Sequence, residues 1–180
     1  RKQFVAAFKD TMVSLKNKQV LLTMHHPLYT TGRHGGKLKF SSLMFPLTKY
    51  NKGMVLPLPV TGVIMGKMRG RISIQDTRSA SYSGYRNHLI PSIESHGNTI
   101  VAAGHEHTLQ YHKVNDVDYI VSGSGSKRGA LGTEEFTKFA YGGYGYGLLD
   151  YYNNGSVWLS FFAESEDRSE FGLVYRAKLK

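Results

Sequence analysis

The sequence predicts an α/β fold whose carboxy-terminal part is β-rich and built from hairpins. Twice, a segment with helical character is followed by a short apolar run typical of a buried strand, at residues 20–24 and 99–103. Such alternation of helix and strand is typical of an α/β layer. Beyond residue 109, β-prone runs alternate with turn signals, of which Asn153-Asn154-Gly155 is the strongest. The 180 residues suffice for one domain, and no repeat or linker divides them.

The opening segment is predicted to be an amphipathic helix that ends near Lys16-Asn17-Lys18. Its apolar residues recur at helical spacing, namely Phe4, Val5, Phe8, Met12 and Leu15. The run Val20–Met24 follows as a buried strand and ends at His25-His26-Pro27. Functional groups of α/β proteins gather at the carboxyl ends of strands, so this unit places a histidine pair where a site is expected.

Residues 37–86 are predicted to be an inserted basic loop or lid, because proline and glycine interrupt them repeatedly. Asp76 is the only acid among them, whereas lysines and arginines recur throughout. A loop of this length inside a compact domain usually has a function. Two interpretations stay open: a solvated basic surface, or a lid that faces an anionic substrate.

A second helix is predicted over Tyr85–Ser95, with Pro91 as the weak point of that prediction. The next buried strand, Thr99–Ala103, ends at Gly104-His105-Glu106-His107, so a second strand also delivers histidines at its carboxyl end. The remainder is predicted to form two hairpins and a last strand, over Leu109–Lys113 with Tyr119–Ser122, Gly142–Tyr152 with Val157–Phe162, and Phe171–Lys180.

Composition excludes several functional classes. The chain has no cysteine, which excludes disulfide scaffolds, thiol catalysis and zinc–thiolate sites. No apolar run approaches the roughly 20 residues of a membrane-spanning helix. The net charge of +10 fits a nucleic-acid binder, a protein that attracts anionic phosphate substrates, or the basic part of a more balanced protein. No recognition helix or RNA-binding aromatic motif accompanies the charge, which disfavours nucleic acid.

Four of the eight histidines lie in two short segments, as the pairs His25 and His26, and His105 and His107. A single buried histidine is usually a hydrogen-bonded core residue. Two strand ends that each carry a histidine pair instead indicate a metal site, because imidazole is a common neutral ligand of Zn, Fe, Mn and Ni.

The segments Met24-His25-His26-Pro27-Leu28-Tyr29 and Gly104-His105-Glu106-His107 resemble the last two metal motifs of calcineurin-like metallophosphoesterases. Within that class they are most similar to purple, or tartrate-resistant, acid phosphatases. Arg33-His34-Gly35 stands at the distance from His25 where those phosphatases keep a substrate-side histidine. Further on, Ser122-Gly123-Ser124-Gly125 and the tyrosine-glycine stretch that begins at Gly142 resemble the closing hairpins of the family.

The resemblance implies a fold and a set of roles. Residues 1–180 would be the carboxy-terminal part of a single metallophosphoesterase domain, half of an α/β/β/α sandwich. His25 and His105 would bind one of two divalent or trivalent ions (Fe, Zn or Mn), and His107 the other. His26 would contact the ligands or the phosphate rather than an ion. His34 would bind the phosphate and protonate the leaving alkoxide while a hydroxide from the two-metal site attacks phosphorus.

The family takes its remaining ligands from an Asp-x-His, a Gly-Asp-x-x-Asp and a Gly-Asn-His-Asp/Glu motif, and none of these occurs in the sequence. Asp10 lies on the predicted opening helix, and Asp116 and Asp118 lie in a predicted turn. We therefore expect the chain alone to be weakly active or inactive, and to lack bound metal unless it is completed. The expected partners are a phosphate-ester substrate and either a missing amino-terminal half or a second copy in a homodimer.

Three hypotheses follow from these observations. The leading one is a fragment of a metal-dependent phosphoric-ester hydrolase. The alternative is a non-catalytic module on the same fold that binds an anion or a metal ion. The third is a nucleic-acid-binding domain. The resemblance favours an extracytoplasmic location, periplasmic or secreted.

Overall fold

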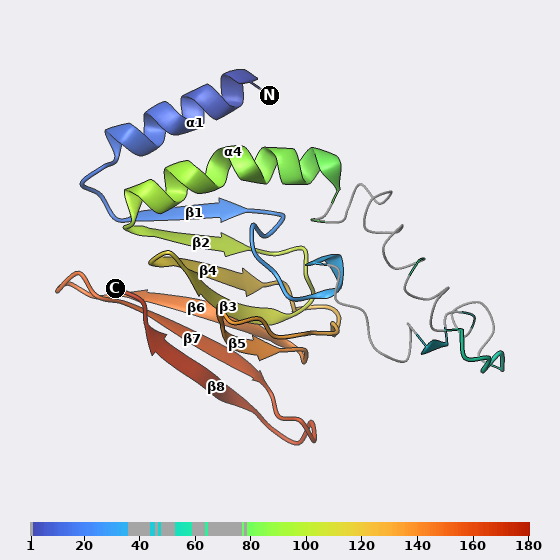
Figure 1. Ribbon diagram of the computed structural model, residues 1–180. Coiled ribbons are helices and arrows are strands. Elements are labelled where there is room, and N and C mark those ends of the chain that lie inside the picture. The colour runs from blue at the N-terminus through green and yellow to red at the C-terminus, as the bar shows by residue number, and fades with distance from the viewer. Residues whose placement is uncertain are drawn as a thin grey trace.

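The computed structural model describes residues 2–35, 44, 45, 47, 53–58, 64, 77 and 79–180. The protein is a mixed α/β structure rich in strands, with a five-stranded and a three-stranded sheet. Two α-helices lie side by side over one face of the five-stranded sheet, and the three-stranded sheet lies on its other side (Figure 1). The predicted α/β class with a β-rich carboxy-terminal part is confirmed at this level.

The five-stranded sheet has the order β1-β2-β4-β3-β5. Strands β1, β2 and β4 are parallel, and β3 pairs antiparallel with both β4 and β5. The carboxyl ends of β1, β2 and β4 therefore meet at one edge of the sheet. The elements concerned are α1 (Lys2–Ser14), β1 (Val20–Met24), α4 (Ala80–His96), β2 (Thr99–Ala103), β3 (Leu109–Val114), β4 (Val117–Ser122) and β5 (Thr137–Tyr141).

The three-stranded sheet is an antiparallel meander of β6 (Gly145–Tyr151), β7 (Val157–Glu164) and β8 (Phe171–Lys178). The β6–β7 turn contains Gly155, whose φ of 82° is the left-handed conformation that glycine adopts without steric cost. Both predicted hairpins and the last strand are confirmed. Strand β5 was not predicted, because its sequence Thr-Lys-Phe-Ala-Tyr is short and has no turn signal close before it.

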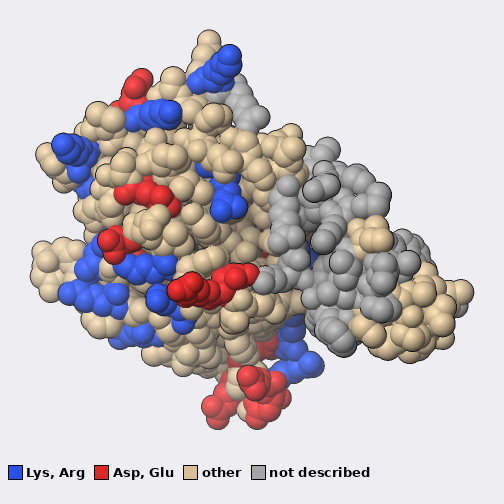
Figure 2. All heavy atoms as spheres, viewed as in Figure 1, with Lys and Arg blue, Asp and Glu red and all other residues tan. Residues whose placement is uncertain are grey.

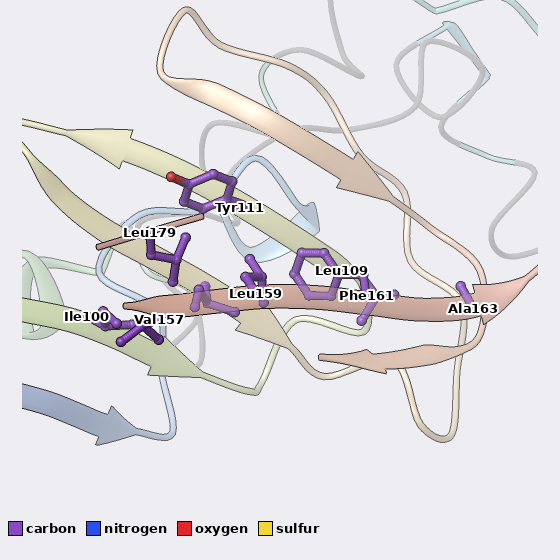
Figure 3. Packing of buried hydrophobic residues seen from close by; sticks show 9 residues of the cluster. Ile100, Leu109, Tyr111, Val157, Leu159, Phe161, Ala163 and Leu179 are labelled. Carbon is purple, nitrogen blue, oxygen red and sulfur yellow. The ribbon is translucent and has the colours of Figure 1, made fainter. Parts of the chain in front are cut away.

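The core between the two sheets is formed by alternate residues of facing strands, which project to the same side. Ile100 of β2 packs there against β7, whose inward residues Val157, Leu159 and Phe161 are fully buried. Figure 3 shows these side chains lying between the two sheets. Each such side chain contributes roughly 1.5–3 kcal/mol through burial, so β7 fixes the second sheet against the first.

The opposite face of the five-stranded sheet is covered by the helices. Val101 and Tyr119, the neighbours of inward-facing Ile100 and Ile120, pack against Leu89 and Ile93 of α4. Both faces of β2 and β4 are thus buried, as is typical of parallel strands in α/β proteins. This burial makes the sheet a rigid support for the loops at its carboxyl edge.

Helix α4 begins at Ala80, earlier than the predicted Tyr85, because the Ser79 hydroxyl accepts a hydrogen bond from the Tyr82 amide and caps the helix. Residues 80–86, predicted as the end of the basic insertion, are therefore helical. Pro91 lies inside the helix, which continues to His96 and ends at Gly97. The rest of the predicted insertion lies almost entirely outside the described residues.

Basic and acidic side chains are interspersed on the face of the molecule seen in Figure 2, without a continuous cationic surface on the described part of that face. Among the described residues, no helix is both long and apolar enough to cross a bilayer.

Candidate metal and anion site

The two histidine pairs meet because β1 and β2 are adjacent and parallel. Met24 at the end of β1 is in register with Ala103 at the end of β2. The pairing extends one step beyond the strands, where the Gly104 amide donates to the His25 carbonyl at 3.2 Å. This register places the residues after Met24 beside the residues after Ala103, so the histidine pairs share one edge of the sheet.

Three imidazoles form the centre of the site. His25, His26 and His105 each offer a ring nitrogen, and these nitrogens all lie within 4.8 Å of one another. Nδ1 of His105 is 3.2 Å from Nε2 of His25. The rings of His26 and His105 are 4.1 Å apart, and those of His25 and His26 are 4.7 Å apart.

The backbone of His105 has a φ of 63°, in the left-handed region that residues other than glycine adopt at a cost of about 1–3 kcal/mol. This conformation of His105 turns the chain sharply after β2. The Glu106 amide then donates to the Gly104 carbonyl at 2.7 Å, and the Thr108 amide to the Glu106 carbonyl at 2.8 Å. These bonds hold the turn in which alternate side chains, His105 and His107, face the cavity while Glu106 between them is buried.

Glu106 connects this turn to the one that carries His34. Its carboxylate is 2% exposed and accepts hydrogen bonds from the amides of His34 at 2.5 Å and Gly35 at 3.1 Å. Gly32 leaves the space for it, since a Cβ there would lie 2.5 Å from the carboxylate carbon. The charged acceptor thus holds the short helix Arg33–Gly35, and with it the His34 ring, 4.5 Å from the ring of His105.

A buried polar network holds the start of the same loop. Oε1 of Gln110, on β3, accepts from the Thr31 amide at 2.9 Å and lies 2.8 Å from Nε2 of His112. The Gln110 amide nitrogen donates to Thr30 at 3.1 Å and to Thr108 at 2.6 Å. Gln110 thus contacts the loop after β1 and the turn after β2, and it fixes their relative positions.

The backbone of His26 is held from α4. The Tyr82 hydroxyl donates to the carbonyls of His26 at 2.8 Å and Pro27 at 3.1 Å. Partial burial lowers the pKa of His26 below its usual value, and the neighbouring His105 and His25 lower it further. The lowered pKa favours the neutral form of the His26 ring, which is the form that binds metal ions.

A cavity of about 470 Å³ opens in front of the imidazoles. Its volume is within the range of roughly 300–1,000 Å³ found for small-molecule sites. The ε-ammonium group of Lys127 has no salt bridge within the described residues, whereas the adjacent Arg128 is 2.5 Å from Glu164. The cavity is lined by His25, His26, His34, His105, His107, Gly123 and Lys127.

All five predicted site histidines thus lie around one cavity, although their individual roles stay predictions. Sequence reasoning missed Glu106, Gln110 and Lys127. The buried carboxylate of Glu106 had a signal, since an acid between two site histidines in a chain of net charge +10 needs a partner. Of the acids considered from sequence, Asp118 is fully buried at the start of β4, where Tyr111 donates to it at 2.8 Å and Lys113 lies 3.0 Å away.

No known protein family matches the chain, and no curated protein matches it. Among solved structures, a similarity is found to GAP50, described as the anchor in the inner membrane complex of Plasmodium. The identity is 23% and the TM-score 0.48, over 58% of this chain. The chain covers 31% of that protein's length. A likeness of this size identifies neither a family nor a function.

Proposed function

We propose that this chain forms part of a metal-dependent phosphoric-ester hydrolase of the calcineurin-like class, as a portion of its α/β/β/α sandwich. The observation that carries the proposal is the convergence of five histidines, from the ends of two parallel strands and a third loop, on one cavity with a lysine at its wall. Neutral imidazoles suit transition-metal ions, and a cation suits a phosphate.

The donor set fits a metal ion in its chemistry. His25 and His105 present ring nitrogens 3.2 Å apart, and ligands about 2.0–2.1 Å from one zinc ion at tetrahedral angles are themselves about 3.3–3.4 Å apart. His107, on the same turn, would serve a second ion. When bound, such ions supply Lewis acidity toward the phosphate oxygens and a nucleophile drawn from water.

His34 is proposed as the residue that protonates the leaving oxygen. Its ring lines the cavity beside His105, and its backbone is held by Glu106 and by Thr77, whose hydroxyl donates to the His34 carbonyl at 2.8 Å. A histidine suits this role because its ordinary pKa lies near neutral pH. Lys127, which also lines the cavity, would bind the anionic phosphate.

Carboxylate ligands are absent from the ligand cluster formed by the described residues, whose members are imidazoles. We propose that oxygen ligands come from outside this chain, from an amino-terminal half or from a second copy. The chain alone would then bind phosphate with the help of metal but turn over esters weakly or not at all.

The test is a calorimetric titration of inorganic phosphate into the full chain with Zn²⁺ or Mn²⁺ and, separately, with a chelator. The proposal expects phosphate binding that requires metal. Where ester turnover is measurable, His34→Gln should slow alkyl phosphates much more than 4-nitrophenyl phosphate, because nitrophenolate leaves without a proton. Absence of phosphate binding in the presence of either metal would contradict the proposal.

The non-catalytic module is the second candidate, favoured by the all-imidazole composition of the described cluster. It differs in a measurable way: an anion-binding module would bind phosphate equally well with the chelator present.

A further inference from the structure

We infer that His26 is a metal ligand, and that His25, His26 and His105 together bind one divalent transition-metal ion using residues of this chain alone. This goes beyond the proposed hydrolase, whose family pattern assigns His26 no contact with an ion. It also stands independently, because it concerns binding by the isolated chain and requires no turnover.

The separations of the ring nitrogens suit a single metal ion. Three nitrogens about 2.0–2.1 Å from a tetrahedral zinc ion are about 3.3–3.4 Å from one another. The His25–His105 pair is 3.2 Å apart, and the complete set with His26 lies within 4.8 Å. His26 therefore brings a third imidazole nitrogen to within 4.8 Å of this pair.

The backbone holds the rings of His105 and His26 in place. His105 has the strained φ of 63°, and this conformation directs its ring toward the residues after β1. His26 is held on the other side by the hydrogen bonds of its carbonyl and that of Pro27 to Tyr82. Strain of this kind is kept where the surrounding structure enforces it, as at ligand-binding sites.

The number of ligands also favours His26 as a member of the site. Two histidines alone leave an ion short of the three protein ligands typical of catalytic zinc, and His26 supplies the third. The three rings and Lys127 line the same cavity, so an anion or water from the cavity would complete the coordination. Imidazole donors favour Zn²⁺, Co²⁺, Ni²⁺ or Cu²⁺ over Mg²⁺ and Ca²⁺, which prefer oxygen.

The test is the titration of metal-free full chain with Zn²⁺, with Mg²⁺ as the comparison ion. We expect one Zn²⁺ per chain. His26→Gln should weaken Zn²⁺ binding at least about 100-fold, since even the partners of metal ligands contribute about 10–100-fold. The exposed control His88→Gln, on α4, should leave the affinity within about threefold.

A second measurement does not depend on any variant. X-ray absorption of the Zn²⁺- or Co²⁺-loaded chain counts the imidazole ligands, and the inference expects three. Two imidazoles, or unchanged affinity in His26→Gln, would overturn it. If phosphate binding requires metal while His26→Gln keeps full Zn²⁺ affinity, this inference fails and the hydrolase proposal stands. If Zn²⁺ binds through three imidazoles but phosphate does not bind, this inference stands and the hydrolase proposal fails.

Discussion

The histidines around the cavity and His112 in the core below them differ in what surrounds their rings. The cavity rings of His25, His26 and His105 face one another and are reached by solvent. His112 is fully buried on β3, with Nε2 at 2.8 Å from Gln110 and its ring against Phe136. The rings at the cavity are accessible to a ligand, whereas the ring of His112 is fixed by packing.

The position of a histidine on the sheet decides whether its ring faces the cavity or the core. His105 follows the carboxyl end of a parallel strand, where the chain turns and side chains reach the cavity. His112 lies within an antiparallel pair, where both neighbouring strands and the loop above it exclude water. Residues seven positions apart therefore face the cavity in one case and the core in the other.

The largest change that we expect is the loss of stability at low pH that His112 causes. Burial lowers the pKa of His112 to about 4, and its Nδ1 has no hydrogen-bond partner among the described residues. The unfolded chain, with an ordinary histidine pKa of about 6.5, binds the proton more readily between these values. The free energy of unfolding should therefore fall by about 3 kcal/mol, from this group alone, as pH drops from about 6.5 to about 4.

His112→Gln should remove that part of the slope while keeping a donor toward Gln110, and the exposed His88→Gln should retain it. Urea unfolding at a series of pH values measures both. Equal slopes for His112→Gln and the unchanged protein would mean that burial does not lower the pKa of His112.

The next effect concerns Glu106, which lies on the turn after β2 and holds the turn that carries His34. Glu106→Gln removes the charge from an acceptor of two backbone amides and should lower the free energy of unfolding by about 2 kcal/mol. It should also speed hydrogen exchange at the amides of His34 and Gly35 by more than about tenfold, a local signature that NMR resolves. Glu135→Gln, at an exposed position, is the control. Unchanged exchange at these two amides would show that the carboxylate does not hold the His34 turn.

The smallest effect is at the cavity wall. Lys127→Gln should weaken the metal-dependent binding of inorganic phosphate by about fivefold at low salt, because an exposed cation contributes at most about 1 kcal/mol. The exposed Lys138→Gln on β5 should leave phosphate affinity unchanged. The difference should shrink as salt is raised. Equal phosphate affinity in both variants would show that Lys127 does not contribute to phosphate binding.

The sequence predicted the parts of this structure that depend on local pattern. Apolar runs predicted β1 and β2, and the turn residues around Gly155 predicted the β6–β7 hairpin. The sequence did not predict that β1 pairs with β2, and the structure supplies the parallel register that sets Met24 beside Ala103. This register places His25 and His105 at one edge.

The remainder depends on contacts between distant segments. The start of α4 was misplaced because the Ser79 cap had no apolar periodicity to mark it. The resemblance placed His26 in contact with the ligands or the phosphate rather than with an ion, because the family needs no ligand at that position. The chain leaves the strand at Met24, so both His25 and His26 can face the cavity.

The most direct test of the account measures how Zn²⁺ changes thermal stability in His105→Gln and His112→Gln at neutral pH. An ion present at 100 times its dissociation constant stabilises the folded state by about 2.7 kcal/mol. The account predicts that this stabilisation is present in the unchanged protein and in His112→Gln, and is lost in His105→Gln. Full Zn²⁺ stabilisation of His105→Gln would contradict the claim that the cavity histidines form the metal site.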